Sequence, residues 1–278
     1  MKSLTLRVGR IPYANLVPIF HALTTHFSLE GIRFVSGDPA ELNRKLRAGR
    51  LDISPSSSIE YAMHPDRYVL CPDISVSSRT KVMSVVLLSN VPLKSLPDGP
   101  IAMTRASDTS VVLLEILLRE FLGKRNRLVR TAFPPGEALR RHTAYLAIGD
   151  EALQAGLSGT ARHVADLGEL WRRETGTPFV FALWIVSRKA LDGRREALRG
   201  FARTLLAAKR IALESLTRPE HLLIGPDWMP KEMRTAYWNN LSYDLSAERE
   251  GLVRFYRLAK KAGRIPSVPP LRFLDLSK

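Results

Sequence analysis

Apolar runs of strand length alternate with amphipathic segments over the first two thirds of the chain. Residues 4–9 and 32–37 are predicted strands, and residues 15–26 and 38–49 are predicted helices. Strands that alternate with helices predict parallel sheets whose faces are covered by those helices. The pattern therefore indicates an α/β protein.

The helix expected at residues 38–49 has the clearest boundaries. Asp38 is suited to cap its first turn, Pro39 takes the first helical position, and Glu41 completes a capping box. Gly49 stands where glycine commonly ends a helix. These signals predict both ends of this helix.

Two longer apolar runs divide the chain. Residues 81–89 and 179–187 are predicted to be long strands, and the stretch between them carries a complete strand–helix pattern of its own. After the second run the chain is mostly helical. We therefore expect two α/β lobes, residues 1–88 with 188–278 in one and residues 89–187 in the other. A single doubly wound sheet is the structural alternative.

Polar side chains follow four of the expected strands, where helices begin. In open α/β sheets, ligands bind beyond the carboxyl ends of strands, and a helix start there offers unpaired N–H groups and the positive end of a dipole. A cleft between two lobes would gather all four junctions. Three of them offer uncharged hydroxyl or amide groups, which suit a carboxylate or phosphate. The candidate ligand-binding residues are Tyr13, Asn15, Ser57, Ser58, Ser107, Thr109, Ser110 and Asp150.

Each of these residues also has a plain structural interpretation. Ser, Thr, Asn and Asp are preferred N-caps in any protein. Ser57 with Glu60 three residues later has the spacing of a capping box, and Asp150 could cap its own helix and do nothing more. The recurrence of such residues at four junctions favours a ligand site over capping alone.

Composition and charge narrow the class of partner. The chain has 278 residues, of which 45% are hydrophobic, enough for a large core. Lys and Arg outnumber Asp and Glu by 42 to 27, and this excess favours anionic partners. The basic residues are scattered along helices, without a basic arm, zinc-finger spacing or aromatic RNA-binding signature. We expect a small anionic substrate and no specific nucleic-acid partner.

Few features of the sequence indicate metal, redox or membrane chemistry. Cys71 is the single cysteine, lies away from the four junctions, and is expected to be a small buried apolar residue. The dinucleotide, P-loop, zinc-protease and serine-hydrolase motifs are missing, and the six histidines do not cluster at metal spacing. Neither a signal-peptide run nor a membrane span is expected. We predict a cytoplasmic protein that needs no metal or cofactor.

Several stretches of the chain occur in an order that resembles one known family. They are RVGRIPYANLVPIFHAL, SSIEYAMHPDRYVLCPDISVSSRTKVMSVVLLS, DTSVVLLEILL, YLAIGDEAL, TPFVFALWIV, and NLSYDL followed by GLVRFYRLAKKAG. The chain resembles the chorismate dehydratases of the futalosine route to menaquinone over nearly its whole length. The first, third and fifth stretches are the most specific.

The resemblance implies a fold, a reaction and roles for particular residues. The fold is that of type II periplasmic binding proteins, and the reaction removes water from chorismate to give 3-[(1-carboxyvinyl)oxy]benzoate. Asn15 and Ser84 match positions that the family places beside the substrate, which makes them the candidate catalytic residues. Thr109 and Ser110 match its carboxylate-binding helix start. Asp108 departs from the family, and an acid there would repel a dianionic substrate if it faced the cleft.

The residues leave two questions open. Hydroxyl and amide groups are poor bases, so the proton acceptor is Glu60, Asp150 or a carboxylate of the substrate itself. The alternative function is a cytoplasmic small-anion binding protein of the same fold that performs no chemistry.

Overall fold

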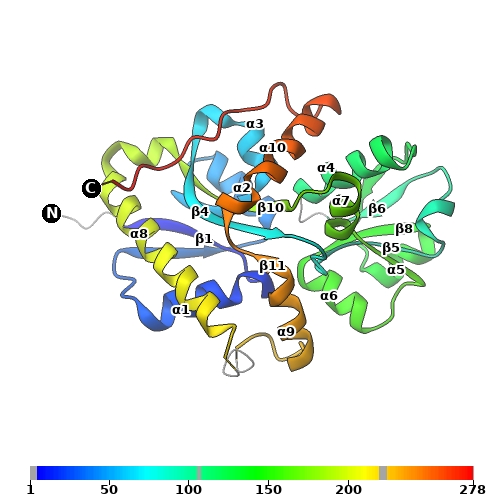
Figure 1. The fold of residues 1–278 in the computed structure, drawn as a ribbon, viewed down its shortest axis with the longest axis horizontal. Coiled ribbons are helices and arrows are strands. Elements are labelled where there is room, and N and C mark those ends of the chain that lie inside the picture. The colour runs from blue at the N-terminus through cyan, green and yellow to red at the C-terminus, as the bar shows by residue number, and fades with distance from the viewer. Residues whose placement is uncertain (1–4, 105–107, 219–223, 278) are drawn as a thin grey trace.

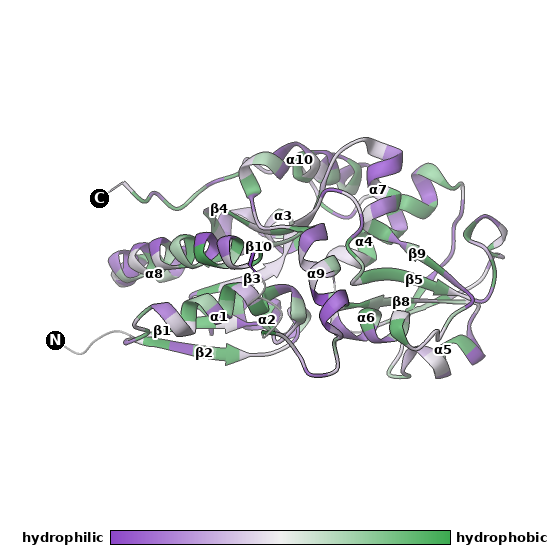
Figure 2. Cartoon of the chain, turned by 60° about the horizontal axis from the view of Figure 1, so that its bottom comes forward, coloured by the Kyte–Doolittle hydropathy of each residue, from purple (hydrophilic) through white to green (hydrophobic). Residues whose placement is uncertain are grey.

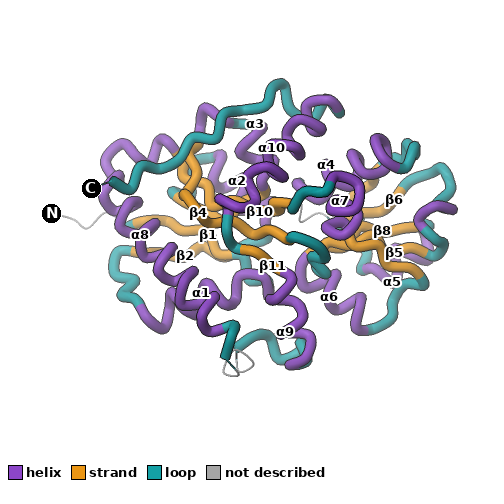
Figure 3. The backbone as a smooth tube through the Cα atoms, in the orientation of Figure 1, coloured by secondary structure: helices purple, strands orange, loops and turns teal. Residues whose placement is uncertain are grey.

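The computed structural model describes residues 5–104, 108–218 and 224–277. Within these residues the strands form two sheets, which lie one beyond the other along the long axis of the molecule (Figure 1, Figure 3). Helices cover both sheets. The expected α/β architecture is confirmed, and the alternative of a single continuous sheet is wrong.

The larger sheet contains both early and late strands of the chain. Its strands are β1 (Leu6–Arg10), β2 (Ile32–Ser36), β3 (Ile53–Ser57), β4 (Tyr68–Ser78), β10 (Phe179–Ser187) and β11 (Leu241–Ser242). Their order across the sheet is β11-β4-β10-β3-β1-β2. β1 is parallel to β2 and β3, whereas β10 runs antiparallel between β3 and β4. The carboxyl ends of β1 and β3 therefore lie at the same edge of this sheet.

The smaller sheet is built from the middle of the chain. Its strands are β5 (Val85–Ser89), β6 (Ile101–Met103), β7 (Leu128–Arg130), β8 (Ala144–Ile148) and β9 (His163–Asp166), in the order β7-β6-β8-β5-β9. β6 is parallel to β7 and β8, and β5 is antiparallel to β8 and β9. The chain thus leaves the larger sheet after β4 and returns to it at β10.

Helices connect the strands and bury one face against them. They are α1 (Val17–His26), α2 (Pro39–Arg47), α3 (Ser58–Met63), α4 (Thr109–Ile116), α5 (Pro135–Arg141), α6 (Gly149–Leu157), α7 (Leu167–Thr175), α8 (Arg188–Ser215), α9 (Lys231–Asn240) and α10 (Leu245–Lys261). Short helical turns occupy η1 (Ala14–Leu16), η2 (Pro65–Arg67), η3 (Leu93–Ser95) and η4 (Leu117–Phe121). None of the helices in the described ranges is both long and apolar enough to cross a membrane.

The apolar positions at helical spacing form the core, as their period predicts. Hydrophobic and hydrophilic positions alternate along α8 and α10 (Figure 2), and the apolar stripe of each helix is buried. The stripe residues are all nearly inaccessible to solvent: Leu198, Phe201, Leu205, Leu252, Phe255 and Ala259. In α2, the Asp38 carboxylate accepts the Glu41 backbone N–H at 2.7 Å, as the capping signals predict.

Two strands, β5 and β10, belong to the opposite lobe from the one predicted. β5 belongs to the smaller sheet and β10 to the larger one, whereas boundaries at 88 and 188 place each strand in the opposite lobe. The chain crosses between sheets before each of these strands, not after it. The run expected at residues 81–89 also forms a strand only from Val85 onward. The segment between Ser78 and Val85 is therefore one of the crossings.

The apolar pattern did not predict three elements, β4, β9 and α7. β4 is the longest strand of the larger sheet, but Pro72 and Asp73 interrupt its sequence, and Asp73 has a left-handed φ of 51°. Proline and a positive φ are unusual within a strand. β9 and α7 were also not expected, although Asp166 caps α7 by accepting the Glu169 backbone N–H at 3.0 Å.

Candidate active site

A narrow cavity of about 60 Å³ lies where the two sheets meet. Apolar side chains of both lobes, including Ile11, Val82 and Phe181, form part of its wall. The structure brings six of the predicted ligand-binding residues together on its lining: Tyr13, Asn15, Ser57, Ser84, Thr109 and Ser110. These residues come from four chain segments; the strand ends predicted the convergence of all of them except Ser84, which came from the family resemblance. Their roles toward a ligand stay a prediction.

Two other predicted residues, Ser58 and Asp150, are not part of the lining of this cavity. Ser58 is fully buried, and its hydroxyl lies 3.4 Å from the Thr109 hydroxyl. Asp150 is half-buried, and its carboxylate accepts the backbone N–H of Ala14 at 2.9 Å. It therefore caps η1 of the other lobe, not its own helix. Ser107 lies outside the described residues.

The Asn15 side chain has an unused hydrogen-bonding atom. Asn15 lies in the short helix η1, directly after β1, where the chain turns toward α1. Its Oδ1 atom is buried, and no hydrogen-bond partner for it exists among the described residues. A buried polar atom without a partner costs free energy, on the order of 1–3 kcal/mol. A ligand that donates a hydrogen bond into the cavity would remove this cost.

Ser84 lies in a tight turn rather than in a strand, which corrects its expected location. The preceding residue, Met83, has a left-handed φ of 59°, rare for a residue other than glycine. The Asp166 carboxylate holds this turn by accepting the backbone N–H groups of Val82 at 3.1 Å and Met83 at 2.6 Å. Such strained turns persist where the surrounding structure fixes them, often at functional sites. The crossing between the lobes thus presents Ser84 to the cavity.

The starts of α3 and α4 meet at the cavity. The Thr109 hydroxyl accepts the backbone N–H of Ile59 at 3.2 Å, so the first turn of α4 contacts the first turn of α3. The N-termini of both helices carry partial positive charge. Two converging positive ends, with hydroxyls beside them, favour a negatively charged group in this part of the cavity.

Asp108 does not face the cavity. Its carboxylate accepts hydrogen bonds from Arg130 at 3.1 Å and from the Asn43 side chain at 3.2 Å. Asn43 also accepts the backbone N–H of Ser57, in its own lobe, at 3.3 Å, so the bond from Asn43 to Asp108 links the two lobes. The acid that departs from the expected pattern is therefore paired with a cation outside the cavity lining, and it forms part of the contact between lobes.

Glu60 is committed to other side chains. It is buried in α3, accepts two hydrogen bonds from Arg47, at 3.1 and 2.8 Å, and accepts the Tyr68 hydroxyl proton at 2.7 Å. The capping box expected from Ser57 and Glu60 is absent, because neither side chain bonds the first turn of α3. The sequence could not show this, since Arg47 and Tyr68 approach only in the folded chain.

Gly149 allows Tyr13 to close one side of the cavity. Gly149 has a φ of +61°, and a Cβ atom placed there would lie 2.7 Å from the Tyr13 ring. Any larger residue would push this ring away. Burial, with the nearby carboxylates, raises the pKa of Tyr13 to about 12, so its hydroxyl keeps its proton at neutral pH.

Cys71 is confirmed as a buried structural residue. It has no solvent exposure, and burial raises the pKa of its thiol to about 12. A thiol that stays protonated is a poor nucleophile.

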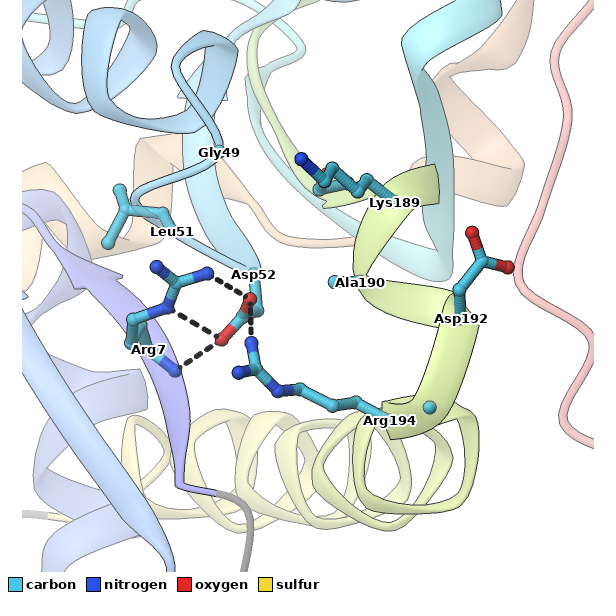
Figure 4. Close-up of a pocket in the computed structure, with 10 residues that line it drawn as sticks. Arg7, Gly49, Leu51, Asp52, Lys189, Ala190, Asp192 and Arg194 are labelled. Carbon is cyan, nitrogen blue, oxygen red and sulfur yellow. Dashed lines mark hydrogen bonds and ion pairs between the residues drawn. The ribbon is translucent and has the colours of Figure 1, made fainter.

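A second hollow, of about 400 Å³, lies at the opposite end of β1 and β3 (Figure 4). At its wall, the buried Asp52 carboxylate accepts hydrogen bonds from Arg7 at 2.7 and 3.2 Å and from Arg194 at 2.7 Å. The two guanidinium groups point at the same carboxylate, which ties β1, β3 and α8 together. The Asp52 carboxylate is thus paired within the protein.

The sequence matches the model of the family described as menaquinone biosynthesis over residues 6–261. A chorismate dehydratase from Thermus thermophilus is 35% identical over 241 residues, which cover 77% of this chain and 86% of that protein.

Solved structures of the periplasmic-binding-protein fold are also similar. A Candida albicans protein that defines a family with the generic periplasmic binding protein fold is 13% identical, with a TM-score of 0.65 and coverage of 99% of this chain and 98% of that chain. The periplasmic aliphatic sulphonate binding protein of Escherichia coli is 15% identical, with a TM-score of 0.61 and 97% coverage of both chains. At these identities the likeness shows the fold alone, and it confirms the expected two-lobed fold.

Proposed function

Because the chain belongs to the menaquinone-biosynthesis family, we propose that it is an enzyme that dehydrates chorismate to 3-[(1-carboxyvinyl)oxy]benzoate, a step of the futalosine route. The observation that carries this proposal is the cavity between the lobes. Among the described residues, the cavity lining has no charged side chain, while hydroxyl, amide and helix-start N–H groups converge on it. Such a site favours a bound anion through neutral hydrogen-bond donors and helix dipoles.

The chemistry of chorismate matches what this site offers. The ring of chorismate is one dehydration away from aromaticity, so loss of water has a large driving force. The enzyme must hold two carboxylates and orient the ring proton and the neighbouring hydroxyl. We assign one carboxylate to the starts of α3 and α4, beside Thr109 and Ser110. Asn15 and Ser84 then face the departing hydroxyl. The Asn15 Oδ1 atom, which has no partner among the described residues, accepts a hydrogen bond from this hydroxyl.

A carboxylate of the substrate is the favoured proton acceptor. Glu60 is paired with Arg47 and lies outside the cavity lining. Asp150 also lies outside it and is engaged with the Ala14 backbone. In this scheme the ring C–H bond breaks and its proton passes to the substrate carboxylate. The electron pair forms the new double bond and the C–O bond breaks. The protonated carboxyl group then gives its proton to the departing hydroxyl, which leaves as water.

Entry of the substrate requires the lobes to separate. A cavity of about 60 Å³ holds a few water molecules but no molecule of the size of chorismate. Single hydrogen bonds between lobes are among the contacts that close the cavity, such as those from the Ala14 N–H to Asp150 and from the Ile59 N–H to Thr109. These bonds are weak enough to break and re-form during a catalytic cycle.

Incubation of the purified protein with chorismate tests the proposal. We expect consumption of chorismate with the appearance of an aromatic dicarboxylate, followed by ultraviolet absorbance and mass spectrometry. Stabilisation by chorismate without turnover would instead support the small-anion binding protein. If chorismate is neither consumed nor able to stabilise the protein, both functions are refuted.

A further inference from the structure

We infer that Tyr237, on α9, is a positioning residue for the reaction, because its hydroxyl fixes the Ser84 side chain at the cavity. This inference rests on the proposed role of Ser84. Tyr237 has no solvent exposure, and its hydroxyl donates a hydrogen bond to the Ser84 hydroxyl oxygen at 2.8 Å. The two residues are 153 positions apart in the sequence, and α9 lies beside the junction of the two sheets (Figure 1).

The bond from Tyr237 determines what Ser84 can offer a ligand. A serine hydroxyl has one proton and two lone pairs. Tyr237 occupies one lone pair, which leaves the Ser84 proton available for donation. The Val82 carbonyl oxygen accepts that proton at 3.3 Å, a long and weak bond for a hydroxyl donor. An oxygen atom of a ligand in the cavity can therefore take the Ser84 proton as a stronger hydrogen bond.

Tyr237 acts through Ser84 rather than as a proton donor of its own. Burial raises the pKa of the Tyr237 phenol, because a phenolate in this apolar environment would be poorly solvated. The phenol therefore keeps its proton at neutral pH, before and after the reaction. Its part is to hold the Ser84 oxygen in place and to keep the proton of Ser84 directed at the ligand.

The same segment holds the turn that carries Asn15. The Trp238 indole N–H donates to the Ala14 carbonyl oxygen at 2.9 Å, and the Tyr243 hydroxyl donates to the Asn15 carbonyl oxygen at 2.5 Å. Trp238 and Tyr243 are both 1% exposed, so their donors would be left without partners if the turn moved. Residues 237–243 thus fix the Ser84 side chain and the Asn15 backbone together, although these two residues belong to different parts of the chain.

Steady-state kinetics of Tyr237→Phe with chorismate test this inference. The substitution removes one hydroxyl and keeps the ring that fills the core. We expect kcat to fall about tenfold, the typical cost of one hydrogen bond lost from the transition state, with little change in KM. In a double-mutant cycle, Tyr237→Phe should add almost nothing to Ser84→Ala, because without the Ser84 hydroxyl Tyr237 has nothing to position.

Tyr145→Phe is the matched control. Tyr145 is also almost fully buried, its hydroxyl bonds the Glu151 carboxylate at 3.0 Å, and it packs in the smaller sheet, away from the cavity lining. We expect this variant to keep its kcat while its melting temperature falls about as much as that of Tyr237→Phe. Trp238→Phe is a second variant in case Tyr237→Phe does not fold, and it should also lower kcat more than it raises KM.

The outcomes separate failure of this inference from failure of the proposed site. Full kcat in Tyr237→Phe and Trp238→Phe, with activity lost in Ser84→Ala, would overturn the positioning role but leave the site intact. Losses that multiply in the double mutant would also overturn it, because the two residues would then act independently. Full activity in Ser84→Ala would refute the proposed site itself.

Discussion

The two ends of β1 and β3 carry opposite kinds of polar chemistry. At their carboxyl ends, Asn15 and Ser57 lie on an uncharged cavity in which the Asn15 amide oxygen has no partner. At their amino ends, Arg7, Asp52 and Arg194 form a cluster in which the buried carboxylate is bonded from both sides (Figure 4). At one end a buried amide oxygen has no partner among the described residues, and at the other the buried carboxylate is bonded within the protein.

This difference follows from the geometry of parallel strands. Helices that follow β1 and β3 begin at the carboxyl ends of these strands, so free N–H groups gather there, whereas α8, which follows the antiparallel β10, begins at the opposite edge. At the amino ends of β1 and β3, the loop before β3 and the α8 helix bring Asp52 and Arg194 beside Arg7, where they form ion pairs. We therefore expect substitutions at the cavity to affect turnover, and substitutions at the ion-pair cluster to affect stability.

The largest expected effect is on turnover by Asn15→Ala and Ser84→Ala. Loss of one well-placed donor or acceptor in an active site commonly lowers kcat by about a hundredfold. Steady-state assays with chorismate measure this, and circular dichroism checks that each variant is folded. If both variants retained full activity, the assignment of the cavity as the active site would be wrong.

Asp52→Ala should lower the free energy of unfolding by about 2 kcal/mol, because Arg7 and Arg194 lose their shared acceptor. The loss is smaller than the 3–5 kcal/mol typical of a broken, fully buried pair, because both arginines are about a quarter exposed. Urea denaturation measures it. The kcat at a temperature where the variant is folded should be unchanged, and a large loss of kcat would contradict the separation of the two ends.

Replacement of Thr109 and Ser110 by alanine should raise KM about tenfold, since hydrogen bonds to a charged group are worth about 1.5 kcal/mol or more. The double variant of Ser158 and Thr160, whose hydroxyls bond each other at 2.6 Å outside the cavity lining, is the control and should leave KM unchanged. An unchanged KM with a lower melting temperature in the Thr109 and Ser110 variant would favour plain helix capping.

The contribution of the ion-pair cluster to the free energy of unfolding should depend on pH. Burial on its own raises the pKa of Asp52, but the hydrogen bonds from Arg7 and the attraction of Arg194 outweigh it and hold the pKa below its ordinary value. The carboxylate therefore contributes stability above that ordinary value, and the contribution is lost as pH falls through the lowered pKa. The difference in unfolding free energy between the wild type and Asp52→Asn should shrink between about pH 5 and pH 2. A difference that stays constant would exclude this linkage.

Glu60→Gln should have the smallest effect on turnover. Glu60 lies outside the cavity lining and is bonded to Arg47 and Tyr68, so we expect kcat to stay within about twofold of the wild type. The same chorismate assay measures it. Abolished turnover in a stable variant would identify Glu60 as the base and exclude the substrate carboxylate.

The convergence on the cavity was predictable from the sequence, because strand ends and helix starts are local signals. Tyr13, Asn15 and Thr109 follow or open elements whose boundaries the pattern indicates, and the topology of α/β sheets then brings them together. The helix capped by Asp38 was predicted for the same reason, since its cap and first turn are adjacent in the chain.

The contacts that come from distant parts of the chain were not predictable. Glu60 had the spacing of a capping box, but Arg47 and Tyr68 bind it in the folded protein. Nothing near Ser84 in the sequence indicates Tyr237. The pattern also does not say which sheet a strand will join, so β5 and β10 were assigned to the wrong lobes. Sheet membership is decided by pairing between strands, which a single sequence does not contain.

A crystal structure of the protein with the aromatic dicarboxylate product bound tests the central claim most directly. We expect the product in the cavity between the lobes, with one carboxylate at the starts of α3 and α4 within hydrogen-bond distance of the Thr109 and Ser110 hydroxyls, and with Asn15 and Ser84 beside the ring. Product bound instead in the hollow beside Arg7, Asp52 and Arg194, with the cavity between the lobes empty, would contradict it.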